Sequence, residues 1–286
     1  MTETSLSPLL ILMVLVAAFM HATWNTLVKS ADDQLLVLSV VNFVCSLAGL
    51  VIILSVGYPN PECWPYIILS ALIHTGYYFF LLKAYEHGDL SLVYPLARGS
   101  APLLVLAGGM LFANEKLPVI GLLGVTLASI GIVSLAFERG WPWHRDSKPI
   151  IFALGTSLFI AAYTLADGIG VRVSDHPLTY IAWLFFIDGI PISIYAMYRR
   201  GAATTVFLRL QWKRCLLGGA SAMLAYGIVI YAMSLGTMAL VAALRETSVI
   251  MAAIIGSLVL KEALGNRRMV AAILVAVGVC TMNLAT

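Results

Sequence analysis

RGSAPLLVLAGGMLFANEKL at residues 98–117 and RETSVIMAAIIGSLVLKEAL at residues 245–264 follow one pattern, and they lie 147 residues apart. Each stretch begins with an arginine, continues through a long apolar run and ends in a short segment that contains Glu and Leu. The same offset pairs Arg98 with Arg245, Ser100 with Thr247, Glu115 with Glu262, Leu117 with Leu264 and Gly131 with Gly278. A constant offset of this kind indicates an internal repeat. The chain is therefore predicted to contain two copies of one unit, at 1–140 and 141–286.

The composition is that of a membrane protein. Of 286 residues, 61% are hydrophobic and 11% are charged, whereas soluble domains have roughly 45–50% apolar and about 25% charged residues. Apolar windows of about 20 residues, long enough to cross a hydrocarbon core, recur along the chain. The sequence predicts ten membrane-spanning helices with short connections. The predicted spans are 7–28, 35–56, 64–84, 91–112, 118–137, 149–170, 178–198, 213–235, 239–260 and 268–285.

The predicted fold class is an all-α integral membrane protein built from two inverted five-helix repeats. Helices are preferred to barrel strands because the windows are continuously apolar, whereas barrel strands alternate in polarity over about 10 residues. Each copy holds five spans, and five is an odd number. The second copy must therefore enter the membrane from the side opposite to the first.

The chain resembles EamA-type members of the drug/metabolite transporter (DMT) superfamily over essentially its whole length. The resemblance rests on HATWNTLVK at 21–29, on the two segments that end in Glu115 and Glu262, and on the surroundings of Gly131 and Gly278. It implies a solute carrier, not an enzyme, that works by alternating access and needs no cofactor. It also implies a cavity lined mainly by spans one, three, four, six, eight and nine, with spans five and ten as scaffold.

Lysine and arginine are concentrated in alternate connections. The loops after spans one, three, five, seven and nine hold 13 of the 17 basic residues when the adjoining span ends with Lys83, Lys213 and Arg214 are included, while the other connections hold only Lys116 and Arg172. By the positive-inside rule, the basic loops face the cytoplasm and both termini face outward. The expected location is a bacterial inner membrane, which the chain crosses many times.

Arg98 and Arg245 are the strongest site candidates, because they are repeat-equivalent and lie within predicted spans. A charged side chain in a bilayer costs roughly 2.5–3.5 kcal/mol on insertion scales, so each needs a partner, water or a function. Two guanidinium groups that converge on a cavity would bind a carboxylate, phosphate or phosphonate. The alternative is two structural ion pairs, with Glu246, Asp167 or Asp188 as counter-ions.

Polar and aromatic side chains at helical spacing complete the predicted substrate site. Each aromatic ring could instead serve packing or the interfacial belt. Carboxyl and imidazole groups take up and release protons, so Glu246, Asp188 and His21 are candidates for proton coupling. Beside the two arginines, the predicted substrate-binding residues are His21, Trp24, Asn25, His74, Tyr78, Tyr94, Tyr163, Asp167, Tyr226 and Glu246.

The expected function is secondary active transport, with export as the expected direction. The two arginines favour a small polar metabolite that is anionic or zwitterionic, such as an amino acid, an organic acid or a phosphonate. Two other classes stay open: a non-transporting membrane scaffold or sensor, and an intramembrane aspartyl protease built on Asp167 and Asp188. The protease lacks its GxGD context, since Leu-Phe-Phe-Ile precedes Asp188.

Several partners are excluded by what the sequence lacks. No GxxxxGK phosphate loop is present, so ATP-driven pumping by this chain is excluded. The net charge is only +3 and no nucleic-acid motif occurs, which argues against a polynucleotide partner. The four cysteines lack metal-ligand spacing, so no metal site is predicted. The expected partners are a small solute and the lipid bilayer.

Overall fold

The computed structural model describes residues 6–29, 33–88, 90–137, 147–252 and 266–284. Within these ranges every regular element is a helix. The elements are α1 (Pro8–Lys29), α2 (Gln34–Val56), η1 (Pro61–Cys63), α3 (Trp64–His87), α4 (Leu90–Phe112), α5 (Val119–Ser134), η2 (Leu135–Phe137), α6 (Lys148–Arg172), α7 (Pro177–Arg200), α8 (Ala202–Leu235), α9 (Met238–Arg245) and α11 (Asn266–Leu284).

Eight of the described helices, α1 to α8, are long and apolar enough to cross a membrane. A helix satisfies its own backbone polar groups, which is what a lipid environment requires. Large apolar side chains such as Leu9, Leu72 and Leu158 are exposed on these helices, as expected for surfaces that face acyl chains. The chain is therefore a multi-pass membrane protein. The predicted count of ten spans stays a prediction, because residues 253–265, including Glu262, lie outside the described part.

The ninth predicted span, 239–260, is not a continuous helix in its described part. Helix α9 ends at Arg245, Glu246 and Thr247 form a turn, and helical backbone resumes at 248–252. At the break, the hydroxyl of Thr247 donates to the carbonyl oxygen of Leu244 over 2.8 Å. A side chain that bonds to a nearby carbonyl competes with the helical hydrogen bonds. The helix therefore breaks at a residue whose side chain bonds to the backbone.

The helix that contains the predicted eighth span, 213–235, is longer than that span. Helix α8 begins at Ala202 and bends at Gln211, whose φ of −112° and ψ of 17° are not helical. Residues 202–210, predicted as loop, contain neither Gly nor Pro and thus carry no helix breaker. The turn that separates them from α7 is made by Gly201, at a φ of +54° that favours glycine.

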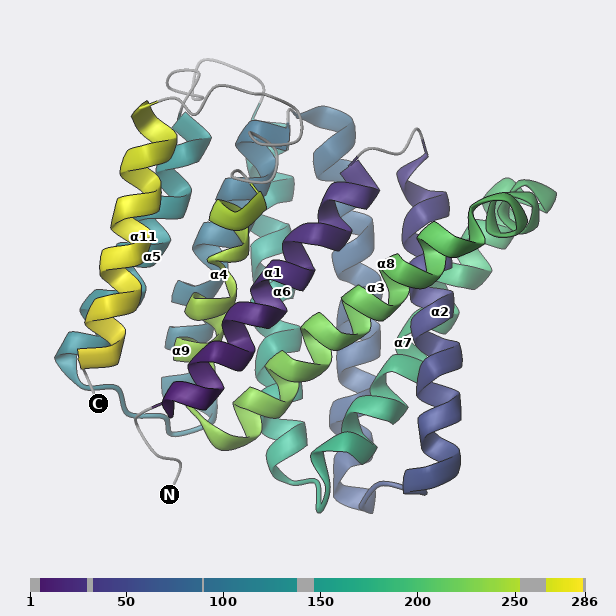
Figure 1. The fold of residues 1–286 in the computed structure, drawn as a ribbon, viewed down its shortest axis with the longest axis horizontal. Helices are drawn as coiled ribbons and strands as arrows, with labels where there is room; N and C mark the ends of the chain where they lie inside the picture. Colours follow the sequence, from purple (N-terminus) through teal and green to yellow (C-terminus); the bar gives the residue numbers. More distant parts are fainter. Residues whose placement is uncertain (1–5, 30–32, 89, 138–146, 253–265, 285–286) are drawn as a thin grey trace.

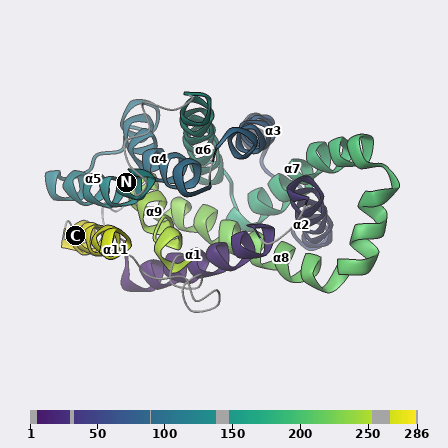
Figure 2. The same cartoon turned by 90° about the horizontal axis from the view of Figure 1, so that it is seen from above.

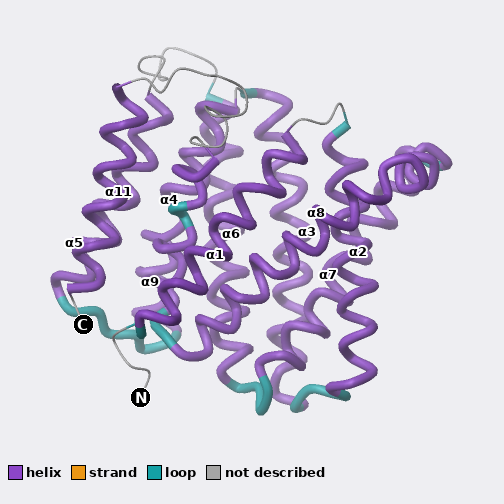
Figure 3. Tube along the Cα trace, in the orientation of Figure 1, coloured by secondary structure: helices purple, strands orange, loops and turns teal. Residues whose placement is uncertain are grey.

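The helices pack in antiparallel and crossed pairs (Figure 1). Helix α2 packs against α7, α3 against α6, α5 against α11, and α1 lies along α8. The first helices of the two halves, α1 and α6, run in opposite directions, and both ends of the chain lie at the lower end in Figure 1. Connections gather at the two ends of the bundle, apart from the break after α9 (Figure 3). Figure 2 shows α5 and α11 together at one edge, away from α2 and α7.

Helices α5 and α11 touch through their backbones. A Cβ atom added to Gly278 would lie 2.7 Å from the carbonyl oxygen of Gly124 and 2.7 Å from the backbone nitrogen of Ala128. Real Cβ contacts are not this short, so the two helices would have to separate. The contact fits the role of small residues in membrane helix packing, where they let backbones approach closely.

We expect Gly278→Leu to lower the Tm of the purified protein by several degrees. Overpacking costs about 1–3 kcal/mol, and each kcal/mol shifts Tm by about 2–4 °C in a chain of roughly this size. The control is Val277→Leu at the neighbouring exposed position, which should leave Tm unchanged in a detergent melting experiment. Equal Tm values for both variants would show that α5 and α11 are not packed this closely.

Candidate solute-binding site

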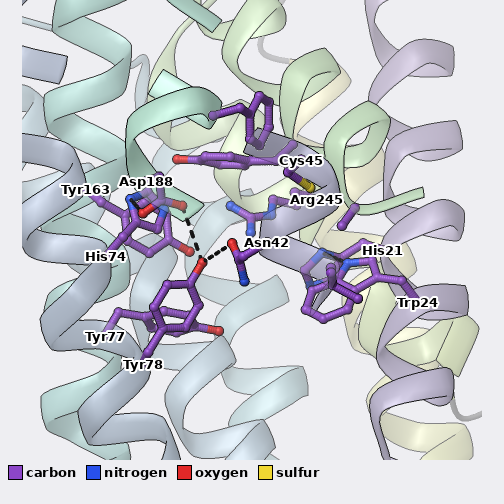
Figure 4. Close-up of a pocket in the computed structure, with 14 residues that line it drawn as sticks. His21, Trp24, Asn42, Cys45, His74, Tyr77, Tyr78, Tyr163, Asp188 and Arg245 are labelled. Atoms are coloured by element: carbon purple, nitrogen blue, oxygen red, sulfur yellow. Dashed lines mark hydrogen bonds and ion pairs between the residues drawn. The ribbon is translucent and has the colours of Figure 1, made fainter. Parts of the chain in front are cut away.

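A cavity is lined by residues of seven helices (Figure 4). The cavity has a volume of about 70 Å³, well below the roughly 300–1,000 Å³ of pockets for drug-sized ligands. It therefore suits a small solute. The lining residues are His21 and Trp24 of α1, Val41, Asn42 and Cys45 of α2, His74, Tyr77 and Tyr78 of α3, Tyr163 of α6, Phe185 and Asp188 of α7, Ala222 and Tyr226 of α8, and Arg245 of α9.

Arg245 is the cation of this cavity. It is the last residue of α9, where the helix dipole favours a positive charge. Its guanidinium carbon lies 4.9 Å from the ring centre of Tyr226, within cation–π range. Among the described residues, no group hydrogen-bonds to this guanidinium and no carboxylate lies within 4.0 Å of it. Its N–H donors thus have no hydrogen-bonded partner within the described residues.

Arg98 has a different environment from its repeat equivalent. Its Nε lies 2.7 Å from Oε2 of Glu246, and both side chains are buried. Neither residue lines the cavity. For Arg98, this geometry matches the structural alternative, in which a carboxylate neutralises the arginine. The roles of Arg98 and Glu246 in contacting solute or carrying protons stay predictions.

Asp188 and its neighbours form an acceptor-rich side of the cavity. The hydroxyl of Tyr78 lies 2.8 Å from Oδ1 of Asn42 and 3.3 Å from Oδ2 of Asp188, and it can donate to either. Oδ1 of Asp188 is buried without a hydrogen bond in the described structure, and Nδ1 of His74 lies 3.9 Å from it. The carboxyl group therefore keeps a free acceptor position. In Figure 4, Arg245 and Asn42 lie between this side and His21.

Aromatic rings form the wall of the cavity between its two charged residues, Arg245 and Asp188. His74 stacks on Tyr163, with ring centres 4.0 Å apart, and Tyr226 meets the His74 ring edge-on at 5.8 Å. Behind this wall, Asp167 accepts hydrogen bonds from Tyr226 at 2.5 Å and from Tyr180 at 3.0 Å. Asp167 thus orients Tyr226 and does not itself line the cavity. This differs from a protease dyad, in which both aspartates face the substrate.

The structure brings eight of the thirteen predicted site residues to the cavity: His21, Trp24, His74, Tyr78, Tyr163, Asp188, Tyr226 and Arg245. The other five, Asn25, Tyr94, Arg98, Asp167 and Glu246, do not line it. The amide nitrogen of Asn25 donates to the carbonyl oxygen of His21 on its own helix. The resemblance placed the fourth span at the cavity, but none of the described α4 side chains lines it, while residues of α2 and α7 do. Asn42 lines the cavity but was not predicted from the sequence. The sequence offers one signal for it, because Asn42 is an amide in the strongly apolar span 35–56.

Among the described residues, no group of three His, Cys, Asp or Glu side chains is placed to hold a metal ion. The side chains that line the cavity offer hydrogen bonding, ion pairing and aromatic contact.

A polar clasp ties α9 to the other half of the chain. Oε1 of Glu115 accepts from Nη2 of Arg172 at 2.6 Å and from the backbone N–H of Met238 at 2.9 Å. Arg172 also donates to the carbonyl oxygens of Met233, at 2.9 Å, and Gly236, at 2.7 Å. The clasp therefore joins the ends of α4, α6 and α8 to the first turn of α9. A carboxylate at a helix N-terminus is favourable, so Glu115 fixes the helix that carries Arg245.

We expect Glu115→Gln and Arg172→Gln each to destabilise the protein by roughly 1.5–3 kcal/mol, because each leaves charged hydrogen-bonding groups unpaired. The double variant should lose less than the sum, with a coupling energy of about 0.5–3 kcal/mol. Thermal unfolding in detergent measures both. The control is the exposed pair Lys83 and Glu86, whose removal should cost about 0–1 kcal/mol. Additive losses at Glu115 and Arg172 would contradict the clasp.

Comparison with known proteins identifies the family. The profile of the EamA-like transporter family matches the chain twice, at residues 8–137 and 147–284. No curated protein matches. One solved crystal structure is 15% identical, covers 96% of this chain and 96% of its own, and has a TM-score of 0.75, a likeness that shows the fold alone. Because the profile matches both halves and nearly the whole length, the chain belongs to the EamA-like transporter family, a family of membrane transporters in the DMT superfamily.

Proposed function

We propose that this chain is a secondary transporter that moves small anionic or zwitterionic metabolites by alternating access, with Arg245 as the group that binds the anionic moiety. The observation that carries the proposal is the contrast between the two repeat-equivalent arginines. Arg98 has a carboxylate partner at 2.7 Å, whereas Arg245 lines the cavity without one among the described residues. A guanidinium away from bulk water needs an anionic or polar partner, and a solute can supply it.

The chemistry of guanidinium narrows the solute's anionic group. Its planar fork of N–H donors matches two oxygens of a carboxylate, phosphate or phosphonate. The guanidinium carbon of Arg245 lies over the ring of Tyr226, and a ligand in the cavity can accept from the N–H donors of the fork. The small cavity volume favours a solute of amino-acid size. An organic acid, an amino acid or a phosphonate meets these conditions.

Asp188 and the aromatic wall favour a zwitterion within this class. An ammonium group would find the free acceptor of Asp188 and the faces of nearby rings, which attract cations. An amino acid or aminophosphonate would then place its anion at Arg245 and its ammonium at Asp188. A simple organic acid would use the first contact alone.

Two features support alternating access. Helix α9 is interrupted after Arg245, and broken helices at the solute site recur in transporters built from inverted repeats. The clasp of Glu115 and Arg172 joins groups from both halves at one end of the bundle. A charged contact between halves is able to form in one state and open in another. We propose export, towards the side of the termini.

We expect Arg245→Gln to abolish stabilisation by the solute while Arg98→Gln retains it. Purified protein is melted against amino acids, organic acids and phosphonates at 100 times Kd, where binding stabilises by about 2.7 kcal/mol. Arg98→Gln should lower the Tm without ligand, because Glu246 loses its partner, yet keep the ligand-induced shift. Retention of that shift in Arg245→Gln would remove Arg245 from the site.

We expect Asp188→Asn to distinguish zwitterions from acids. Asn keeps the shape but loses the charge, so Kd for amino acids should rise about tenfold or more, equivalent to about 1.4 kcal/mol, while Kd for organic acids changes less than about twofold. The control is Asp167→Asn, which loosens Tyr226 behind the wall and should affect both ligand classes alike. Equal effects of Asp188→Asn on both classes would argue against an ammonium subsite.

Flux in proteoliposomes distinguishes a carrier from a sensor. The best-binding solute is loaded inside, and efflux and uptake are measured separately for wild type and Arg245→Gln. Wild-type protein should move the solute at least about tenfold faster than the variant, since the variant lacks the anion contact. Tight binding without any flux would favour the non-transporting sensor.

A further inference from the structure

The connection between α7 and the membrane-crossing part of α8 is basic and helical. No acidic residue occurs between Asp188 and Glu246. Within residues 199–214, hereafter the basic segment, all five charges are positive and all five side chains are exposed: Arg199, Arg200, Arg209, Lys213 and Arg214. Arg200 forms an ion pair with Asp33 at 2.7 Å. For the other four, no carboxylate of the described chain lies within salt-bridge distance.

Two local breaks turn this segment across the bundle. Gly201 ends α7 at a φ of +54°, and Gln211 interrupts α8 with non-helical angles. The helical turns between them are seen nearly end-on at the right of Figure 1. In Figure 2 the same turns lie in the plane of the picture and run from top to bottom at the right. Their axis is therefore roughly perpendicular to the upright helices, as in a helix that lies in the plane of a membrane surface.

The basic segment has one side against the protein and one side free. The hydroxyl of Thr204 donates to the carbonyl oxygen of Ala196 over 3.4 Å, and Phe207 packs on the apolar cluster around Leu38 in α2. These contacts fix the rotation of the helix. The free side carries Val206, Leu210 and Trp212, which are 52%, 76% and 54% exposed, beside the basic groups.

We propose that the basic segment binds anionic phospholipid headgroups of the adjacent leaflet, a role that goes beyond solute transport. Lysine and arginine next to a membrane are attracted to a negative lipid surface. The apolar side chains on the same side enter the boundary of headgroups and acyl chains, as in interfacial amphipathic helices. Trp212, with Lys213 at 5.6 Å from its ring centre, takes the position that tryptophan prefers at the interface.

The combination of charge and apolar exposure favours lipid over a soluble acidic partner. An acidic protein would pair with the cations but would leave Leu210 and Trp212 without an apolar environment at the membrane surface. A bilayer supplies both the phosphate charges and the hydrocarbon. The segment also follows directly on α7 and leads into the crossing part of α8, as expected for a segment at the membrane surface.

The test is a melting experiment in neutral detergent with added phosphatidylglycerol or phosphatidylcholine. Phosphatidylglycerol should raise the wild-type Tm by about 3 °C more than phosphatidylcholine does. Salt at 1 M shortens the Debye length to about 3 Å and should remove this difference. The triple variant Arg209→Gln, Lys213→Gln, Arg214→Gln should lose at least about half of it.

Two controls separate charge from folding. The charge-preserving triple variant Arg209→Lys, Lys213→Arg, Arg214→Lys should keep the phosphatidylglycerol effect, and Lys116→Gln, at a basic position outside the segment, should keep it too. If the glutamine triple variant fails to fold, Arg209→Gln and Lys213→Gln alone should each lose about a third. A full phosphatidylglycerol effect in the glutamine variants, or an equal effect of both lipids on wild type, would overturn the proposal.

Discussion

The low polarity of the bilayer interior is the constraint on which this structure depends. A charge placed there must be paired, hydrated or bound to a ligand. Within the spans the chain pairs Arg98 with Glu246, and at one end of the bundle it pairs Arg172 with Glu115. Both pairs join α4 or the segment after it to another part of the chain. Arg245 alone among these three arginines reaches the cavity without a carboxylate from the described residues. The distribution of partners, more than the distribution of charges, therefore supports the proposal that solute binds at Arg245.

Helix α9 concentrates these interactions in eight residues. Glu115 holds its first residue, the pair of Arg98 and Glu246 lies just beyond its last, and Arg245 projects from its end into the cavity. Glu246 keeps helical backbone angles, with φ −70° and ψ −9°, and its N–H donates to the carbonyl oxygen of Ala242. Successive side chains on a helix point about 100° apart. Arg245 therefore faces the cavity while Glu246 faces Arg98.

Sequence patterns predict the helical membrane fold because the length and apolarity of each span can be read directly from the sequence. They also identify most of the residues that line the cavity, since polar groups in apolar spans are rare. They did not distinguish Arg98 from Arg245, because repeat equivalence says nothing of which carboxylate lies nearby in space. The contribution of Asn42 and Phe185 depends on how α2 and α7 pack, which is a tertiary property. Residues 202–210 were predicted as loop because they lie between apolar windows, although nothing in them breaks a helix.

The two fixed ends of α9 have a consequence for how this chain can diverge. With Glu115 holding one end and the buried ion pair holding the other, the distance from Met238 to Arg245 is set by the surroundings. Each residue inserted or deleted there would rotate Arg245 by about 100° around the helix axis and shift it by about 1.5 Å. The length of α9 is therefore fixed by its two ends. On the proposed role of Arg245, recognition of a different solute would require another residue type at this position and not another spacing.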